Sequence, residues 1–189
     1  MLTLLEKLCN AFGPSGYEDE VRAIIIDEIK DYATSYRVDA VGNLIVFKKG
    51  RKVPSYKRLF SAHMDEVGFL VTGITDEGYL RFAPVGGVDA AVVYGRRVLV
   101  NGLPGVIGGK AKHLCSEDEQ KNVPAFSKLL IDIGAVNRAQ AEVLARPGDA
   151  VVFDSAWTAL AGDRFKARAL DDRVGCALLL SLLEKTPPV

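Results

Sequence analysis

Cysteine is scarce in this sequence of 189 residues, and its three cysteines, Cys9, Cys115 and Cys176, lie far apart. None of them belongs to a Cys-x-x-Cys pair, and their number is odd. This pattern argues against a disulfide framework and against a zinc site made of thiolates. It is typical of a reducing compartment, and we predict a cytoplasmic protein.

An excess of one charge is also absent. Lys and Arg together number 24, Asp and Glu together number 24, and neither sign gathers into a block. Proteins that bind nucleic acid or an anionic membrane surface usually carry a basic patch that the chain does not show. We therefore expect neither nucleic acid nor a membrane as a partner.

Long hydrophobic runs are missing as well. The longest apolar stretch, residues 174–183, is interrupted by a glycine and a serine and falls far short of the roughly 20 residues that span a bilayer. The first ten residues show apolar side chains at helical spacing, without the basic start and small-residue cleavage site of a signal peptide. The sequence predicts a folded N-terminal helix and no membrane segment.

What the sequence does contain is an ordinary globular composition with 49% hydrophobic residues, enough for one sizeable core or two small ones. Hydrophobic periodicity predicts helices over residues 2–12 and 15–32, and strands over 36–39, 41–47 and 56–62. Ser15 and Glu18 have the spacing of a capping box for the second helix. This order of elements is typical of the start of an α/β or α+β enzyme domain.

The pattern changes between about residues 67 and 165, where short β-like runs recur between glycines and one helix is expected over 138–145. Such short, regularly spaced strands favour a small β-barrel or sandwich. Helical periodicity returns after Arg168. The predicted organisation is a first domain formed by residues 1–66 and 166–189, into which a β-domain of residues 67–165 is inserted.

His63 and Asp65 are the first candidates for a functional site. They follow an apolar run, and residues two apart in a strand point to the same side. A carboxylate beside an imidazole is the usual way to orient a metal-binding histidine, although an ordinary hydrogen-bonded histidine has the same appearance. Glu66 would point to the opposite face, and we interpret it as structural.

Asp171 and Asp172 are the second candidates, directly before an apolar helix. One aspartate is enough to cap that helix. If Asp172 takes this role, Asp171 can point elsewhere, and a carboxylate in such a place can bridge two cations about 3.5 to 4 Å apart. Nucleophilic catalysis is disfavoured, because the chain has no Gly-x-Ser-x-Gly turn and its cysteines lack the context of a nucleophile.

Two segments carry a family resemblance. Residues 61–68 (Ser-Ala-His-Met-Asp-Glu-Val-Gly) and 169–175 (Ala-Leu-Asp-Asp-Arg-Val-Gly) resemble the N-terminal signatures of the tetrahedral-aminopeptidase family, whose members are also known as glutamyl or deblocking aminopeptidases and as endoglucanase M. Further matches follow in the family's order at residues 14–18, 39–44, 86–89, 105–108, 112–114, 132–135 and 148–149. The resemblance covers essentially the whole chain.

The resemblance implies an α/β fold: an incomplete aminopeptidase-type α/β/α catalytic domain with an inserted PDZ-like β-barrel that drives dimerisation. It also implies two divalent metal ions, zinc or cobalt. His63 would bind one of them, Asp171 would bridge both, and Asp65 would be a catalytic residue that hydrogen-bonds His63. A cis peptide between Asp171 and Asp172 is a further family feature.

The chain departs from the family pattern in one respect. A Glu-Glu pair, which supplies the general base and a ligand, and two later ligands would all lie beyond Val189. We therefore expect the N-terminal part of an oligopeptide-cleaving aminopeptidase, which by itself binds metal weakly and is inactive. A non-catalytic module that self-associates through the β-domain or binds peptides is the alternative. A glycoside hydrolase is less favoured, because it needs paired carboxylates rather than a histidine ligand.

Overall fold

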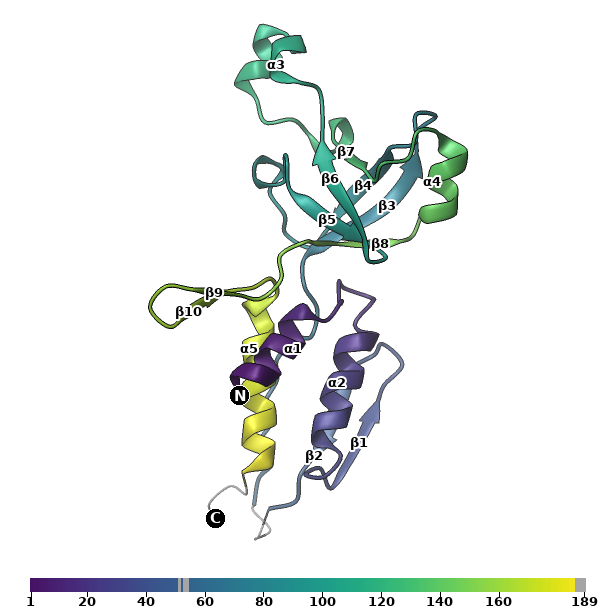
Figure 1. Cartoon of the computed structure of the whole chain (residues 1–189). Coiled ribbons are helices and arrows are strands. Elements are labelled where there is room, and N and C mark those ends of the chain that lie inside the picture. The colour runs from purple at the N-terminus through teal and green to yellow at the C-terminus, as the bar shows by residue number, and fades with distance from the viewer. Residues whose placement is uncertain (51, 53–54, 186–189) are drawn as a thin grey trace. The chain divides into compact units, whose positions relative to one another are not determined.

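The computed structural model describes residues 1–50, 52 and 55–185. It divides into two compact units, one formed by Met1–Glu66 with Ala156–Val189 and the other by Val67–Ser155 (Figure 1). The last four residues of the predicted segment 166–189 lie outside the described part. Among the described residues, no helix is long and apolar enough to cross a bilayer.

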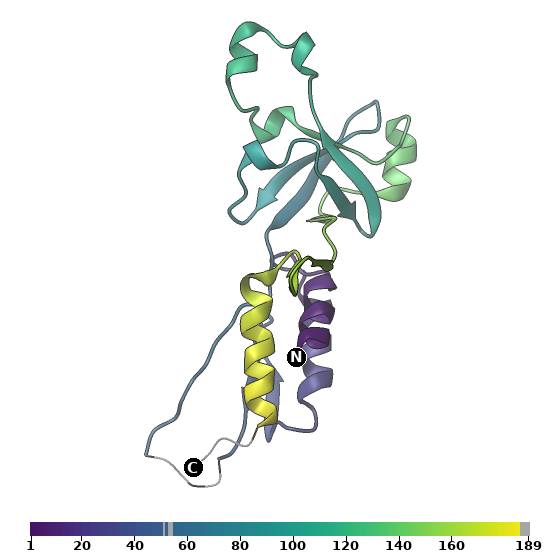
Figure 2. The ribbon, with the colours of Figure 1, turned by 60° about the vertical axis from the view of Figure 1, so that its left-hand side comes forward.

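The first unit is built from helices around a small apolar core. Its elements are α1 (Leu2–Asn10), α2 (Asp19–Ile29), β1 (Ser35–Val38), β2 (Leu44–Phe47), β9 (Thr158–Leu160), β10 (Arg164–Lys166) and α5 (Leu170–Glu184). Helix α5 lies beside α1 (Figure 2), and both contribute buried side chains, among them Leu8 and Leu180, to one cluster. The two N-terminal helices, the β1–β2 hairpin and the last helix confirm the sequence prediction.

The strand predicted over residues 56–62 is wrong. This segment has no strand assignment, and the nearest ladder contact is an isolated parallel bridge between Pro14 and Glu66. A strand requires a neighbouring backbone that accepts and donates hydrogen bonds, and the described residues place none beside this segment. Leu59, which the apolar pattern assigned to a buried strand, is 91% exposed.

The predicted capping box at Ser15 is also wrong. Helix α2 begins after Glu18, which makes no side-chain cap, and the Glu18 carboxylate instead accepts a hydrogen bond from the backbone N–H of Gly16 at 2.8 Å. The Ser15 hydroxyl donates to the carboxylate of Asp65. The loop between α1 and α2 runs next to residues 63–66, and this tertiary contact takes the place of the local cap.

The second unit contains a closed six-stranded barrel, which confirms the prediction of a small β-barrel. Its strands are β3 (Gly68–Ile74), β4 (Leu80–Val85), β5 (Arg97–Val100), β6 (Leu103–Gly108), β7 (Leu130–Asp132) and β8 (Ala150–Phe153), in the order β3-β4-β7-β6-β5-β8. Helices α3 (Glu117–Lys121) and α4 (Arg138–Leu144) and three short 3-10 turns complete the unit. Phe69 packs edge-on against Phe82 and Phe153 inside the barrel.

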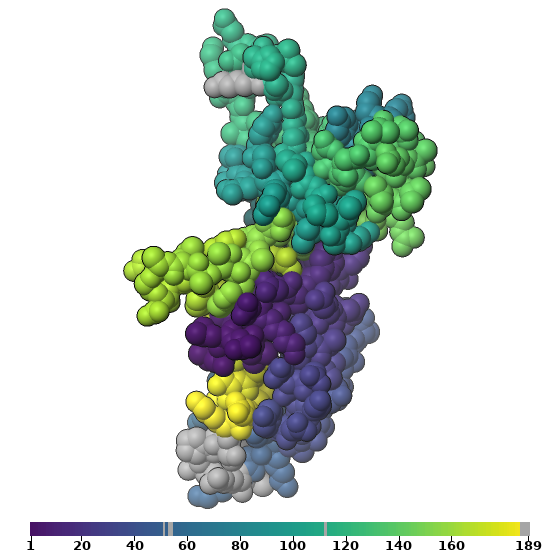
Figure 3. All heavy atoms as spheres, in the orientation of Figure 1, coloured from purple at the N-terminus to yellow at the C-terminus, as the bar shows by residue number. Residues whose placement is uncertain are grey.

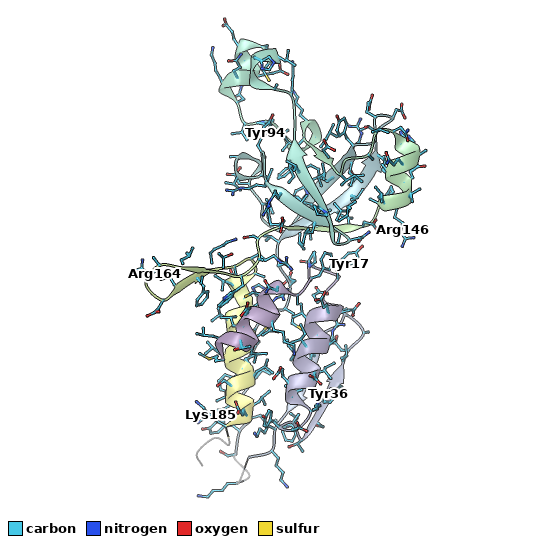
Figure 4. All side chains as sticks on the ribbon, viewed as in Figure 1. Tyr17, Tyr36, Tyr94, Arg146, Arg164 and Lys185 are labelled. Carbon is cyan, nitrogen blue, oxygen red and sulfur yellow. The ribbon has the colours of Figure 1, made fainter. Side chains whose placement is uncertain are left out.

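The second boundary of the inserted unit lies at residue 155 and not at 165 as the sequence suggested. The β9–β10 hairpin, marked by Arg164 in Figure 4, belongs to the first unit, and its atoms form the yellow-green projection on the left of Figure 3. Trp157 stacks on Phe165 with ring centroids 3.9 Å apart, and both side chains pack on the core formed by α1, α2 and α5. The backbone N–H of Trp157 also donates to Asn10 Oδ1 at 3.0 Å.

Two glycines of β6 allow a matched test of the barrel packing. A Cβ atom added to Gly105 would lie 2.9 Å from Ile131 Cγ2 and 3.1 Å from the carbonyl oxygen of Asp132, whereas one added to Gly108 would meet nothing within 4 Å. We expect Gly105→Ala to destabilise the barrel by about 1–3 kcal/mol through overpacking. Gly108→Ala should leave its stability unchanged or slightly raised.

Hydrogen exchange of the barrel amides, followed separately from those of the first unit, measures both effects. Equal exchange rates in the two variants would contradict the described packing between β6 and β7.

Candidate metal centre

Two segments of the first unit that are far apart in sequence meet at His63. Its Nδ1 atom lies 2.9 Å from Asp65 Oδ1, and its Nε2 atom lies 3.0 Å from Asp171 Oδ1. The His63 side chain is 54% exposed and that of Asp171 is 94% exposed. The structure therefore brings together the three residues that the sequence singled out and leaves their contact open to solvent.

Asp65 is held in place by a residue that the sequence analysis assigned elsewhere. The Ser15 hydroxyl donates to Asp65 Oδ2 while Asp65 Oδ1 faces the His63 ring. The hydrogen bond from Ser15, with a further contribution from His63, outweighs the effect of partial burial and lowers the pKa of Asp65. Asp65 is thus an ionised acceptor that fixes the orientation of the ring.

The imidazole of His63 lies between two carboxylates. Burial lowers the pKa of His63, but the contacts with Asp171 and Asp65 together outweigh it, so that the pKa is raised above its ordinary value. Only the protonated ring can donate to both carboxylates at once. In the neutral ring, Asp65 favours the tautomer that carries its proton on Nδ1, which leaves Nε2 free to act as a ligand.

Asp171 and Asp172 take different roles, as the sequence predicted. Both have non-helical backbone angles at the start of α5, and the peptide bond between them is cis, as the family resemblance implied. Asp172 Oδ1 accepts a hydrogen bond from the backbone N–H of Gly175 at 3.0 Å, which caps the helix. Asp172 therefore serves the helix, and Asp171 is left to face His63.

Three charged side chains lie buried next to these segments. Glu66 is 5% exposed, which agrees with its structural interpretation, and Arg173 is fully buried. Arg168 Nε lies 3.0 Å from Glu66 Oε2, and Arg173 Nη2 lies 3.8 Å from Glu66 Oε1. Burial raises the pKa of Glu66 in spite of both arginines. The burial of Arg168 and Arg173 could not be predicted from the sequence, because no hydrophobic or motif pattern marks an arginine as buried.

The chemistry of the exposed atoms fits a divalent metal ion. An imidazole nitrogen and a carboxylate oxygen that bind one zinc ion at about 2.0–2.2 Å with tetrahedral geometry lie roughly 3.3 Å apart, close to the 3.0 Å between His63 Nε2 and Asp171 Oδ1. A zinc site needs three or four protein ligands, however. Within the described residues, no cluster of three or more His, Cys, Asp or Glu side chains is arranged to hold a metal ion. The residues fit part of a site.

Neither the other histidine of the chain, His113, nor Cys176 is placed as a catalytic group of this site. His113 lies in a 3-10 turn (Lys112–Leu114) of the barrel unit. Cys176 lies close to His63, and its thiol donates to the His63 carbonyl oxygen at 3.2 Å. Burial raises the pKa of Cys176 to about 11, opposite to the lowered pKa of a reactive thiol.

A family profile and individual related proteins both match this chain, and both are of aminopeptidases. The sequence profile of the M42 glutamyl aminopeptidase family matches residues 42–188. A putative aminopeptidase from Acetivibrio thermocellus is 40% identical over 186 residues, which are 98% of this chain and 54% of that protein. The chain therefore spans about half the length of this relative.

Solved structures show the same relationship. The crystal structure of a TET aminopeptidase from a marine sediment Thaumarchaeota archaeon superposes with a TM-score of 0.90 at 36% identity and covers 96% of this chain and 52% of that one. The TET1 peptidase of Pyrococcus horikoshii, described as assembling into a tetrahedron or a large octahedral shell, gives a TM-score of 0.82 at 44% identity over 98% of this chain and 56% of that one.

The contact between Asp65 and His63 predicts a specific change in titration. Replacing Asp65 by Asn removes a negative charge that stabilises the imidazolium, so the pKa of His63 should fall. Any stability that this contact contributes is present below the pKa of a free histidine and is lost as the pH rises through the raised pKa. NMR titration of the imidazole nitrogens measures the shift, and the His113 resonances provide an internal reference. An unchanged His63 titration in Asp65→Asn would contradict the described geometry.

Proposed function

The chain belongs to the M42 glutamyl aminopeptidase family, and we propose that it supplies one half of the two-metal centre of an enzyme that removes N-terminal residues from oligopeptides. The observation that carries this proposal is the position of His63 between Asp65 and Asp171, with Nε2 facing an exposed carboxylate at 3.0 Å. The named relatives are aminopeptidases, and the chain spans about half of their length.

Each residue of the half-site has a distinct role in this proposal. His63 Nε2 and Asp171 would hold the metal ions, and Asp65 would fix the orientation and tautomer of His63. The family is generally metal-dependent. Zinc or cobalt ions, when bound, supply Lewis-acid polarisation of the scissile carbonyl and of the attacking water. Ser15 donates a hydrogen bond to Asp65 and so supports His63 indirectly, through Asp65.

The surface of the first unit supports the view that further polypeptide completes the centre. On α5, Val174, Leu178 and Leu182 follow one another at four-residue spacing and are all partly exposed, Leu178 to 53%. Residues four apart share a helix face, so α5 carries an apolar stripe on its exposed side. Together with the unpaired segment 56–62, this stripe fits a surface that the rest of an α/β catalytic domain covers, with the general base and the remaining ligands on that part.

A second role, self-association through the barrel unit, is favoured by a separate observation. The related TET1 peptidase is described as a large assembly, and the barrel unit exposes several apolar side chains, Val92, Tyr94, Leu114, Val136 and Val143 (Tyr94 is labelled in Figure 4). We propose that this PDZ-like unit mediates contacts between copies of the chain. Peptide binding by the same unit would be the non-catalytic form of this role.

A glycoside hydrolase fits the site less well. That chemistry uses two carboxyl groups as an acid and a base or nucleophile on either side of a sugar. Asp65 is already engaged by Ser15 and His63 and is not available for proton transfer to a substrate. The cytoplasmic location stays a prediction from the cysteine pattern.

The half-site proposal predicts that the purified 189-residue chain is catalytically inactive. With zinc or cobalt present, release of N-terminal residues from a set of oligopeptides should not exceed that of the His63→Ala variant, because the described residues bring together only His63 and Asp171 as exposed ligands, and a zinc site needs three or four. Amino-acid analysis of the products measures this release. Turnover by the wild-type chain that His63→Ala abolishes would contradict the proposal that only half of the centre is present.

The self-association proposal predicts a mass larger than one copy. Multi-angle light scattering should show a mass that rises with concentration, and Leu178→Glu on the first unit should not lower it, because the contact is assigned to the barrel. A single-copy mass at every concentration would refute this role, and a loss of association in Leu178→Glu would move the contact to α5.

A further inference from the structure

The buried cluster of Glu66, Arg168 and Arg173 is linked by the chain itself to the candidate metal ligands. Glu66 directly follows Asp65, while Arg168 and Arg173 lie three residues before and two residues after Asp171. The side chain of Arg173 is fully buried, that of Glu66 is 4% exposed and that of Arg168 is 9% exposed. The charges of the cluster therefore sit between the two segments that carry the site.

Contacts across the cluster connect these two segments. Arg168 Nε and Arg173 Nη2 approach the two oxygens of Glu66 at 3.0 and 3.8 Å, respectively. The Glu66 carboxylate thus contacts one arginine that precedes Asp171 in the sequence and one that follows it. With one negative and two positive side chains, the group carries a net charge of +1 when all three are ionised.

The same side chains also attach both segments to the end of α1. Arg173 Nη1 donates to the Leu8 carbonyl oxygen at 2.6 Å, and Arg168 Nη2 donates to the carbonyl oxygens of Asn10 and Ala11 at 2.7 and 3.0 Å. The backbone N–H of Glu66 donates to the Gly13 carbonyl oxygen at 2.9 Å. Three parts of the first unit are thereby fixed relative to one another at the site.

Stability alone explains this arrangement poorly. Three buried atoms of the cluster have no hydrogen-bond partner among the described residues: Glu66 Oε1, Arg173 Nε and Arg173 Nη2. Buried polar atoms left unpaired lower the stability of the fold, and apolar side chains of similar volume in place of buried ion pairs often raise it. A buried charged cluster instead makes the electrostatic energy depend strongly on the distances between its charges. The Glu66 carboxylate and the two guanidinium groups must therefore stay close together.

We propose that Glu66, Arg168 and Arg173 are positioning residues, which set the separation of His63 and Asp171 and so prepare the half-site for a metal ion. This inference rests on the proposed function. When Glu66 loses its charge, the two guanidinium groups have no counter-charge between them, and the segment of Asp171 moves relative to that of His63. The three side chains are buried, so in this proposal they act through His63 and Asp171 and are not themselves ligands.

Cobalt titration of the full 189-residue chain tests the proposal, with the visible absorption of bound Co²⁺ as the readout. The informative variants are Glu66→Gln, which removes the charge with little change of shape, and Glu66→Gln/Arg173→Met, which restores the net charge of +1 to the cluster. Glu28→Gln is the matched control, because Glu28 pairs with Lys7 on the surface of the same unit at 3.4 Å. His63→Ala defines the signal of a chain without the histidine ligand.

We expect Glu66→Gln to lower cobalt affinity about 10- to 100-fold, the usual effect of losing support for a metal ligand. The double variant should recover thermal stability but not cobalt affinity, and Glu28→Gln should change neither. Recovery of both properties together in the double variant would show a merely structural role and overturn the proposal. An unchanged affinity in folded Glu66→Gln would overturn it as well. If Glu66→Gln does not fold, the cobalt affinity of the double variant tests the proposal: a lowered affinity supports it, and the wild-type affinity overturns it.

Failure of the proposed function has a different signature. In that case the wild-type chain and His63→Ala give the same cobalt titration. Crystal structures of the metal-free wild-type chain and of the double variant then test the positioning role by itself. A separation between His63 Nε2 and Asp171 Oδ1 that increases from the 3.0 Å of the wild-type chain supports it, and an unchanged separation overturns it.

Discussion

The contact between His63 and Asp171 is the constraint on which the candidate site depends, because it brings together residues that are 108 positions apart in the sequence. Between the two residues the chain forms the barrel unit, Val67–Ser155, and then rejoins the first unit at Ala156. The contact requires that the segment of Asp171 be placed next to that of His63. The barrel has its own buried core, so it can close independently of the site. The first unit has to place both segments with side chains from α1, α5 and the loop that precedes α2.

Electrostatics at the site follows from this placement. Ser15 holds Asp65, Asp65 holds the His63 ring, and Asp172 caps α5, which leaves Asp171 free to face the ring. Behind them, Glu66 sits between Arg168 and Arg173. The exposed groups are those that we propose to bind a metal ion, and the buried charges are those that we propose to position them. In this proposal, His63 and Asp171 are the ligands that this part of an M42 family member supplies.

Patterns with a regular period could be predicted from the sequence, and contacts between distant segments could not. Helices α1, α2, α4 and α5, the barrel strands and the His63–Asp65 pair follow from local spacing, whereas the short helix α3 (Glu117–Lys121) was not predicted. The separate roles of Asp171 and Asp172 follow from helix capping. Ser15 was assigned to a cap because the capping box is a local rule, while its actual partner is 50 residues away. The strand over residues 56–62 was wrong because strand pairing depends on a neighbour, which periodicity does not supply. In the sequence Arg168 and Arg173 cannot be distinguished from surface arginines, because their contacts with Glu66 appear only in the folded structure.

In the proposed function, His63 and Asp171 bind the same metal ion. The most direct test is anomalous diffraction from crystals of the chain soaked with Zn²⁺, recorded on both sides of the zinc absorption edge. We expect a zinc peak about 2.0–2.2 Å from both His63 Nε2 and a carboxylate oxygen of Asp171, with Asp65 still hydrogen-bonded to Nδ1. A zinc peak that contacts only one of the two residues, or zinc bound elsewhere with this pair left unchanged, would contradict it.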